Sequence, residues 1–449
     1  MCCIHMKIYF VSLGCDKNLV DSEMMLGLLH EAGHEIVDDE NLADVVVINT
    51  CSFIHDAKEE SINTILELAD LKKTGRLKGI VACGCLSERY ADQIRTELPE
   101  VDVVVGTMAI DEIVGAVNAV ARGERTEFLK PTDGPLVYGK PRLVTTGGHY
   151  AYLKIAEGCD KHCTYCAIPK MRGTYRSVPM EVLVHEAETL VSEGVKELIL
   201  VAQETTLYGV DLYNEKSLPK LLRALSGIED LHYIRILYCY PEEITDELID
   251  EISYNKKVVK YLDIPIQSGA DRVLKRMGRR TDRAELETLI GKLRAKIPDI
   301  CIRTTLISGF PGESRSDFKE TYEFVKKMRF DRLGVFTYSR EEDTAAARMK
   351  GHLPEFVKKG RMNKLMKLQQ SIAFEKAEEE VGRTLTVFVE GKMPEDGVYV
   401  CRTYKDAPNV DGYLFLETEK DLMSGDLIKA RVTRAQQYDL VGVPEDELT

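Results

Sequence analysis

Short, nearly continuous runs of β-branched residues alternate with helical patterns over the first 110 residues of this 449-residue chain. Runs of this kind indicate parallel strands that are covered by helices on both faces of a sheet. Strands are predicted at 7–14, 44–50, 79–84 and 101–107, with helical patterns such as 21–33 and 61–71 between them. We therefore expect an α/β fold that begins with a doubly wound parallel domain.

A second alternation begins near residue 150. Apolar residues at three- and four-residue spacing predict helices between the strands. The strands are predicted at 150–158, 197–204, 233–241, 261–269, 301–312 and 332–339. Six such units predict an incomplete TIM-like (βα)6 barrel, in which an active site would lie at the C-terminal ends of the strands. Pro and Gly interrupt the patterns at 111–149, which we expect to be a linker.

The last part of the chain changes character. A charged amphipathic helix is predicted at about 355–381, and short strand patterns separated by Gly- and Asp-containing turns follow it. This spacing is typical of a small OB-like β-barrel. A chain of this length is expected to form several domains. The predicted domains are 1–140 including the linker, 141–373 and 374–449.

Composition limits the functions that this chain can have. It has 60 Lys and Arg against 74 Asp and Glu, a net charge of −14. This charge disfavours a surface-wide nucleic-acid binder and leaves room for a basic partner. The sequence shows neither a secretory signal pattern nor the roughly 18 apolar residues that span a bilayer. We expect a cytoplasmic protein, whose 12 cysteines favour metal or redox use over disulfides.

Two sets of three cysteines stand at predicted strand ends. Cys15, Cys51 and Cys85 each close a different strand of the first domain. Strand ends at a switch point of such a sheet can converge on one site. Cys159, Cys163 and Cys166 form a C-x3-C-x2-C motif after the first barrel strand.

The C-x3-C-x2-C motif has no fourth cysteine nearby. A structural zinc site or an ordinary iron–sulfur cluster takes four protein ligands, so three thiolates leave a position open for an exogenous ligand. A structural zinc site and reduced core thiols are the alternatives.

The other cysteines and two histidines have simpler interpretations. Cysteines inside apolar strand patterns are expected to act as small hydrophobic residues; they are Cys83, Cys239, Cys301 and Cys401. Cys2 and Cys3 have no role if translation starts at Met6. His55 and His162 stand near the two cysteine sets and could ligate iron or relay protons. We expect them instead to face solvent or to support the sites as polar neighbours.

The C-x3-C-x2-C motif after the first barrel strand resembles the hallmark of the radical S-adenosylmethionine (SAM) superfamily. The resemblance implies a 4Fe-4S cluster on Cys159, Cys163 and Cys166, with SAM on the open iron and its cleavage to a 5′-deoxyadenosyl radical. The SAM contacts that it implies are Tyr165 before the third cysteine, Gln203 and Glu204 in VAQE, and Gly309 and Gly312 in ISGFPGE. VAQE departs from the superfamily pattern, because Ala202 and Gln203 replace two glycines. Glycines let a backbone approach a ligand closely.

Over essentially its whole length the chain resembles the methylthiotransferases of that superfamily. This resemblance implies a second 4Fe-4S cluster on Cys15, Cys51 and Cys85, again with one open iron, which carries the sulfur group. SAM would serve both as radical source and as methyl donor, and the C-terminal barrel would be a TRAM domain. An electron donor such as flavodoxin or ferredoxin would reduce the clusters.

Three stretches resemble the branch that modifies the β-carbon of an aspartate in ribosomal protein S12. They are SLGCDKNLVDSE at 12–23, AEGCDKHCTYCAIPKMRGTYRS at 156–177 and YKDAPNVDGYLF at 404–415. Residues 381–449 include 13 Asp or Glu and 8 Lys or Arg, a net charge of −5. An RNA-binding module should instead present clustered basic residues to phosphates. The acidic tail suits a basic ribosomal protein, although an acidic proteome would give the same charge.

Two other functions stay open from sequence. The same chemistry on tRNA adenosine near the anticodon would show as steeply salt-dependent tRNA binding. A non-catalytic iron–sulfur protein that interacts with the ribosome would not bind SAM.

Overall fold

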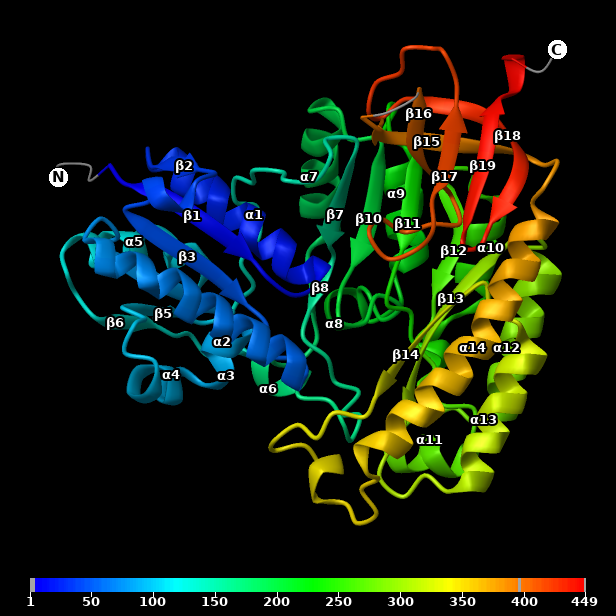
Figure 1. The fold of residues 1–449 in the computed structure, drawn as a ribbon, viewed down its shortest axis with the longest axis horizontal. Helices are drawn as coiled ribbons and strands as arrows, with labels where there is room; N and C mark the ends of the chain where they lie inside the picture. The colour runs from blue at the N-terminus through cyan, green and yellow to red at the C-terminus, as the bar shows by residue number, and fades with distance from the viewer. Residues whose placement is uncertain (1–4, 395–396, 448–449) are drawn as a thin grey trace.

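The N-terminal domain is a six-stranded parallel sheet with helices on both faces (Figure 1). The computed structural model describes residues 5–394 and 397–447. The strand order is β2 (Glu35–Val37), β1 (Lys7–Ser12), β3 (Val45–Thr50), β4 (Gly79–Gly84), β5 (Val103–Val105) and β6 (Thr126–Phe128). One face packs against α1 (Asp16–Glu31) and α5 (Ile113–Ala121). The other face packs against α2 (His55–Ala69), α3 (Cys85–Arg89) and α4 (Ala91–Glu97). The doubly wound prediction is confirmed.

The predicted linker at 111–149 is partly wrong. α5 buries Ile113, Ala116 and Val117 against the N-terminal sheet, and β6 then pairs with β5. Within the predicted linker, the long stretch without helix or strand is 129–149, which leads into the first central strand. The sequence pattern missed β2 and β6 because three-residue edge strands are too short to show a period.

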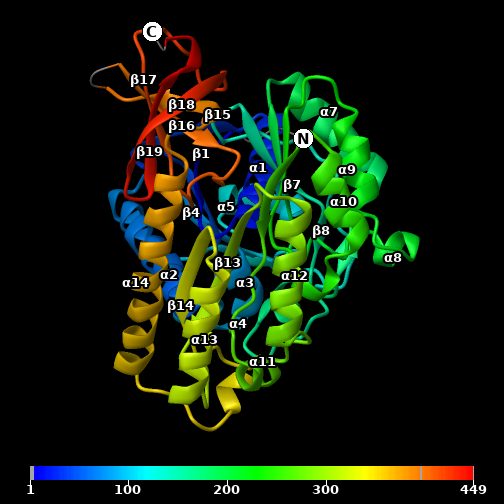
Figure 2. The same ribbon diagram turned by 90° about the vertical axis from the view of Figure 1, so that its right-hand side faces the viewer.

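The central domain is an open six-stranded parallel sheet, as predicted for an incomplete TIM-like barrel (Figures 1 and 2). Its strands are β7 (Tyr150–Lys154), β10 (Glu197–Val201), β11 (Tyr233–Ile236), β12 (Val258–Asp263), β13 (Cys301–Ser308) and β14 (Arg332–Thr337). The helices along the sheet are α7 (Met180–Ser192), α9 (Leu218–Ser226), α10 (Asp246–Tyr254), α12 (Arg283–Lys296) and α13 (Arg315–Met328). Shorter elements at the strand ends are β8 (Ala156–Glu157), α6 (Ile168–Arg172), β9 (Arg176–Ser177), α8 (Val210–Tyr213) and α11 (Asp271–Met277).

The C-terminal domain is a closed barrel of five strands in the order β15-β16-β17-β19-β18, which confirms the small β-barrel prediction. The strands are β15 (Thr384–Lys392), β16 (Val398–Thr403), β17 (Leu414–Glu417), β18 (Leu427–Gln436) and β19 (Asp439–Pro444). The long α14 (Glu355–Glu379) precedes the barrel and crosses the domain boundary predicted at 373/374. Short 3-10 helices lie at 40–42, 70–74, 110–112, 241–243, 346–348 and 445–447.

The C-terminal barrel docks at the N-terminal ends of the central strands. Glu197, the first residue of β10, is fully buried and forms ion pairs with Arg402 of β16 and, at 2.8 Å, with Arg235 of β11. The loop after β16 reaches into the central sheet, where the Tyr261 hydroxyl donates to Asp411 at 2.7 Å. The cysteine loops follow the opposite, C-terminal ends of the strands. The two regions therefore lie at different ends of the molecule.

The predicted structural cysteines are confirmed. Cys83, Cys239 and Cys401 are completely buried and Cys301 is 1% exposed, each within an apolar cluster. Cys2 and Cys3 lie outside the described residues. In the described part of the chain, no helix combines the length and the apolar character needed to span a membrane.

Candidate metal centres

The N-terminal cysteines come from three separate loops at one edge of the sheet. Cys15 precedes α1, Cys51 follows β3 and Cys85 begins α3. Gly14 has a φ of +94°, and a Cβ there would lie 3.1 Å from the Cys51 sulfur, so only glycine allows these loops to approach so closely. Burial raises the pKa of the Cys85 thiol to about 12; the Arg172 guanidinium opposes this shift, and the nearby Cys15 and Cys51 thiols add to it. The predicted convergence of the three loops is therefore present.

One buried side chain that the sequence analysis missed organises all three loops. The Asn18 Nδ2 donates to the Leu13 carbonyl and to the Thr50 carbonyl, both at 3.0 Å, and these oxygens lie just before Cys15 and Cys51. The Cys85 thiol lies 3.7 Å from the Asn18 Oδ1 and donates to it. Asn18 is completely buried and is the third residue of α1, in its first turn. An asparagine inside a helix is a poor helix former, and this was the available signal.

The barrel cysteines lie on one tight loop after β8. Cys159 and Cys163 are each 9% exposed, and Cys166 is half-buried. The Cys166 amide donates to the Cys163 carbonyl at 3.0 Å, and the Cys163 sulfur lies 2.9 Å from the Tyr240 hydroxyl. Burial raises the pKa of Cys159 and of Cys166 to about 12. A bound metal would deprotonate these thiols.

The two histidines near the cysteine sets face solvent, as expected. His55 begins α2 and is exposed, and its amide lies 3.4 Å from the Ser339 hydroxyl. His162, between Cys159 and Cys163, is exposed and has a φ of +51°.

The thiol sets fit a cluster better than a single ion. Among the residues that the structure describes, no three His, Cys, Asp or Glu side chains are grouped as the ligands of one metal ion. Each cysteine of a 4Fe-4S cluster binds a different iron, so its sulfurs need not converge on one point. Three buried or half-buried thiols on one loop, and three at one sheet edge, are the number of thiolates that a cluster with one open iron would take from the protein.

The short α6 joins the two cysteine sets. It begins two residues after Cys166 and packs Met171 beside Cys85. The Ser52 hydroxyl contacts the Met171 sulfur at 3.0 Å, and the Thr107 hydroxyl donates to the Met171 carbonyl at 2.7 Å. The loop of the barrel set therefore continues directly onto the N-terminal set, and the two sites are neighbours.

Gln203 and Glu204 offer unpaired acceptors near the barrel cysteines. The Gln203 Nε2 donates to Glu157 at 2.5 Å, and Glu204 accepts from the Thr206 amide at 2.8 Å. In the described chain, the Gln203 Oε1 and the Glu204 Oε2 are buried without a hydrogen-bond partner. Burial raises the pKa of Glu204 to about 7. Orphaned acceptors of this kind suit the ammonium group of an amino-acid ligand.

The other predicted SAM residues lie in the adjoining strand ends. Tyr165 is half-buried and meets Phe310 edge-on, with the ring centroids 6.4 Å apart. Gly309 and Gly312 have φ values of +73° and +81°. A Cβ on Gly309 would lie 2.3 Å from Lys358, and one on Gly312 would lie 3.0 Å from Arg276. Protein side chains therefore fill the space beside both glycines, so backbone conformation and close packing are what demand glycine here.

Known families match the three domains in turn. Residues 7–106 match the uncharacterized protein family UPF0004, residues 153–325 match the radical SAM superfamily and residues 381–444 match the TRAM domain. Together with the cysteine loops, these matches define a three-domain radical SAM enzyme.

Relatives of nearly full length identify the family within this class. The chain is 60% identical to the ribosomal protein uS12 methylthiotransferase RimO of Lachnoclostridium phytofermentans, over 98% of this chain and 100% of the relative. It is 49% identical to the RimO protein of Acetivibrio thermocellus, over 97% of this chain and 98% of the relative. The chain belongs to the RimO family of radical SAM methylthiotransferases.

Solved structures of distant proteins share the fold. The radical SAM methyltransferase TsrM from Kitasatospora setae, with cobalamin and a [4Fe-4S] cluster bound, has a TM-score of 0.53 at 14% identity, covering 88% of this chain and 81% of its own. The cobalamin-dependent enzyme OxsB with SAM bound has a TM-score of 0.52 at 14% identity, covering 83% of this chain and 56% of its own. As a radical SAM enzyme, the present protein uses SAM and 4Fe-4S cluster chemistry.

Proposed function

We propose that this protein attaches a methylthio group to the β-carbon of an aspartate in ribosomal protein S12. The observation that carries the proposal is the junction at α6, which places a C-x3-C-x2-C loop directly against a second set of three cysteines. Two neighbouring cluster sites suit a reaction that needs both a radical and a sulfur donor. The relatives that match over the whole chain are named for S12 modification.

The assignment of residues to cofactors is part of the proposal. Cys159, Cys163 and Cys166 would hold the cluster that binds SAM, and the N-terminal set would hold the cluster that carries sulfur. Tyr165, Gln203 and Glu204 would line the SAM site, and the turn that contains Gly309 and Gly312 would lie beside it. When bound, these cofactors supply the difficult chemistry, in which a radical removes hydrogen from an unactivated carbon and a methylthio group takes its place.

The chain itself positions and shields the reactants. Asn18 fixes the three N-terminal loops, and burial shields the Cys51 and Cys85 thiols from water, whereas Cys15 is exposed. The unpaired oxygens of Gln203 and Glu204 would orient the amino end of SAM. No conventional acid or base is needed to break a C–H bond by a radical.

The remaining features of the proposal concern domains, partners and place. We assign 1–140 to the N-terminal domain, 141–373 to the radical SAM domain and 374–449 to the TRAM domain. Flavodoxin or ferredoxin is the proposed electron donor. Because the proposed substrate is a ribosomal protein, the reaction would take place in the cytoplasm.

Mass spectrometry of candidate substrates tests the proposal. Recombinant S12 and tRNA would each be incubated anaerobically with the iron-reconstituted protein, SAM, reductant and sulfide, and the Cys51→Ala variant serves as control. We expect one methylthio gain on an S12 aspartate and none in the control. A gain on tRNA adenosine would favour the tRNA alternative. Formation of 5′-deoxyadenosine without any substrate gain would contradict both substrates, and a failure to bind SAM would favour a non-catalytic protein.

A further inference from the structure

Arg172 belongs to the radical SAM domain, and its positively charged side chain lies beside the N-terminal cysteines. It ends α6, six residues after Cys166, and is only 3% exposed. Its Nη2 donates to the Cys85 sulfur at 3.4 Å and also to the Asn18 Oδ1. A residue from the loop that follows one cysteine set therefore contacts a member of the other set.

The other arm of the Arg172 guanidinium completes a buried ionic group across the domain boundary. Its Nη1 donates to Asp21 of α1 at 2.7 Å and to Glu157 of β8 at 3.1 Å. Lys154, at the end of β7, pairs with the same two carboxylates and contacts Glu157 at 2.9 Å. Two cations balance two carboxylates in this group. The planar fork of arginine serves four partners at once, which a lysine ammonium cannot do in the same geometry.

We infer that Arg172 is a positioning residue for the N-terminal cluster. It holds Cys85 against the radical SAM domain, and it raises the reduction potential of the cluster on Cys15, Cys51 and Cys85. This inference rests on the proposed function, which assigns a cluster to those cysteines. Hydrogen bonds to the sulfurs, local charge and solvent exposure are the protein's means of setting such potentials. Reduction adds one negative charge to a cluster, and a buried cationic donor stabilises that charge with little screening by solvent.

The hydrogen bond from Arg172 to the Cys85 sulfur links the two domains. Arg172 belongs to the radical SAM domain, whereas Asn18, Asp21 and Cys85 belong to the N-terminal domain. The potential of the sulfur-carrying cluster therefore depends on correct docking of the two domains. Loss of the contact should affect the N-terminal cluster without removing any ligand of the SAM-binding cluster.

A redox titration followed by electron paramagnetic resonance tests the inference. The titration uses the full chain with Cys159→Ala, Cys163→Ala and Cys166→Ala, so that only the N-terminal cluster is present. We expect Arg172→Gln to lower the midpoint potential of that cluster. Arg172→Lys keeps the positive charge but loses the forked hydrogen bonds. The midpoint potential of its cluster should lie between those of the chain with Arg172 and of Arg172→Gln.

Lys154→Gln is the matched control. It removes one positive charge from the same ionic group but no hydrogen bond to the Cys85 sulfur. Its shift in potential should be less than half of the shift in Arg172→Gln. Hydrogen exchange gives a second readout, because the amides of α1 should exchange faster in Arg172→Gln if this residue ties α1 to the barrel.

The intact protein with all six cysteines should show separated effects. In Arg172→Gln we expect 5′-deoxyadenosine formation to stay within about twofold of wild type, while methylthio transfer falls roughly tenfold, as is usual for the partners of metal ligands. An unchanged potential in Arg172→Gln, or equal shifts in Arg172→Gln and Lys154→Gln, overturns the inference. If Arg172→Gln retains no cluster, Arg172→Lys decides: a lowered potential supports the inference and a wild-type potential overturns it. Absence of a cluster in the chain with Arg172 intact instead refutes the proposed function on which the inference rests.

Discussion

At the scale of single residues, the two cysteine sets differ in what holds them. The N-terminal thiols depend on contacts between loops that are distant in sequence, above all those of Asn18. The barrel thiols share one short loop, closed by a hydrogen bond between the Cys166 amide and the Cys163 carbonyl. Substitutions in the two sets should therefore have separable effects.

Replacing one cysteine from each set separates the two cluster roles. Cys163→Ala should end 5′-deoxyadenosine formation, because the SAM-binding cluster loses a ligand. Cys51→Ala should keep that activity and end methylthio transfer, with about half of the iron lost. Iron analysis and mass spectrometry of both products measure these effects. Cys83→Ala is the control, since Cys83 is fully buried in the core; the assignment fails if Cys163→Ala still forms 5′-deoxyadenosine.

Asn18→Leu should weaken the N-terminal cluster site without removing a ligand. The leucine is similar in size but leaves the Leu13 and Thr50 carbonyls unpaired, at a cost of about 1–3 kcal/mol for each buried group. We expect faster loss of iron from the anaerobic protein in the presence of a chelator. Asn41→Leu, at an exposed position of the same domain, is the control. Equal rates of iron loss in both variants would show that Asn18 does not organise this site.

At the scale of secondary-structure elements, the N-terminus of α13 stabilises the turn that carries two predicted SAM residues. α13 begins after the turn that contains Gly309 and Gly312. Its capping box pairs the Ser314 side chain with the Asp317 amide, and the Asp317 side chain with the Ser314 amide. Arg272 of α11 also contacts the Asp317 carboxylate, with one hydrogen bond of 3.0 Å. The cap therefore connects α11, α13 and the glycine turn.

Asp317→Asn should destabilise this region in a pH-dependent way. Burial alone would raise the pKa of Asp317, but hydrogen bonds from Arg272 and Ser314 outweigh it and lower the pKa to about 2. The ionised carboxylate thus stabilises the fold above the unfolded pKa of about 4, and this contribution is lost as the pH falls toward 2. We expect a loss of about 1 kcal/mol at pH 7.

Urea unfolding of wild type and Asp317→Asn checks this expectation. The difference in free energy of unfolding should be the same at pH 7 and pH 5 and should shrink at pH 3. Glu323→Gln, at an exposed position of the same helix, should show almost no difference at any of these pH values. A difference that grows on acidification would refute the proposed role of the carboxylate.

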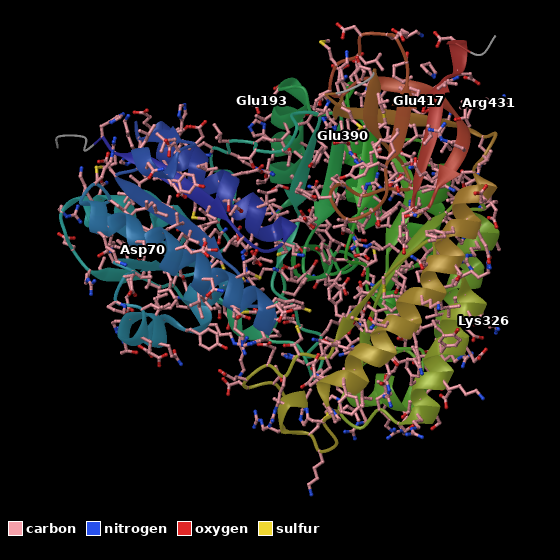
Figure 3. The ribbon with its side chains drawn as sticks, viewed as in Figure 1. Asp70, Glu193, Lys326, Glu390, Glu417 and Arg431 are labelled. Carbon is pink, nitrogen blue, oxygen red and sulfur yellow. The ribbon has the colours of Figure 1, made fainter. Side chains whose placement is uncertain are left out.

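At the scale of the whole molecule, the C-terminal barrel and the cysteine sites lie at different ends. In Figure 3, Glu417 and Arg431 lie on the C-terminal barrel, far from Asp70 on the N-terminal domain. The barrel docks at the N-terminal ends of the central strands, whereas the cysteine loops follow their C-terminal ends. Its acidic surface can therefore attract a basic partner over a distance, but it does not line the cysteine sites.

Reversing charge on the C-terminal barrel should slow the encounter with S12. The exposed pair Glu419 and Asp421 changed to Lys should lower kcat/KM for S12 roughly threefold to tenfold at low salt, and the deficit should shrink as salt rises. The double variant Glu320→Lys and Glu323→Lys on α13 makes the same charge change elsewhere and is the control. Initial rates across a series of salt concentrations measure both. Equal deficits in the two variants would mean that only net charge matters.

The sequence predicts the three architectures well because each depends on local periodicity. The apolar runs of β3, β4 and the six central strands are long enough to show their type. β2 and β6 are three-residue edge strands, and α5 lay within a segment that Pro and Gly made look like a linker. These elements form because they pair with or pack against the rest of the N-terminal sheet. Contacts of this kind produce no local pattern in the sequence.

The sequence by itself determined the six candidate ligands, because their residue type and spacing carry the chemistry. Only the tertiary structure decided which other residues serve them. Asn18 and Arg172 are 154 residues apart, yet both contact Cys85. The Asn18 contact forms within the N-terminal domain, whereas the Arg172 contacts arise from the docking of α6 on that domain. Such docking depends on packing between domains, and packing between distant segments leaves no periodic signal along the chain.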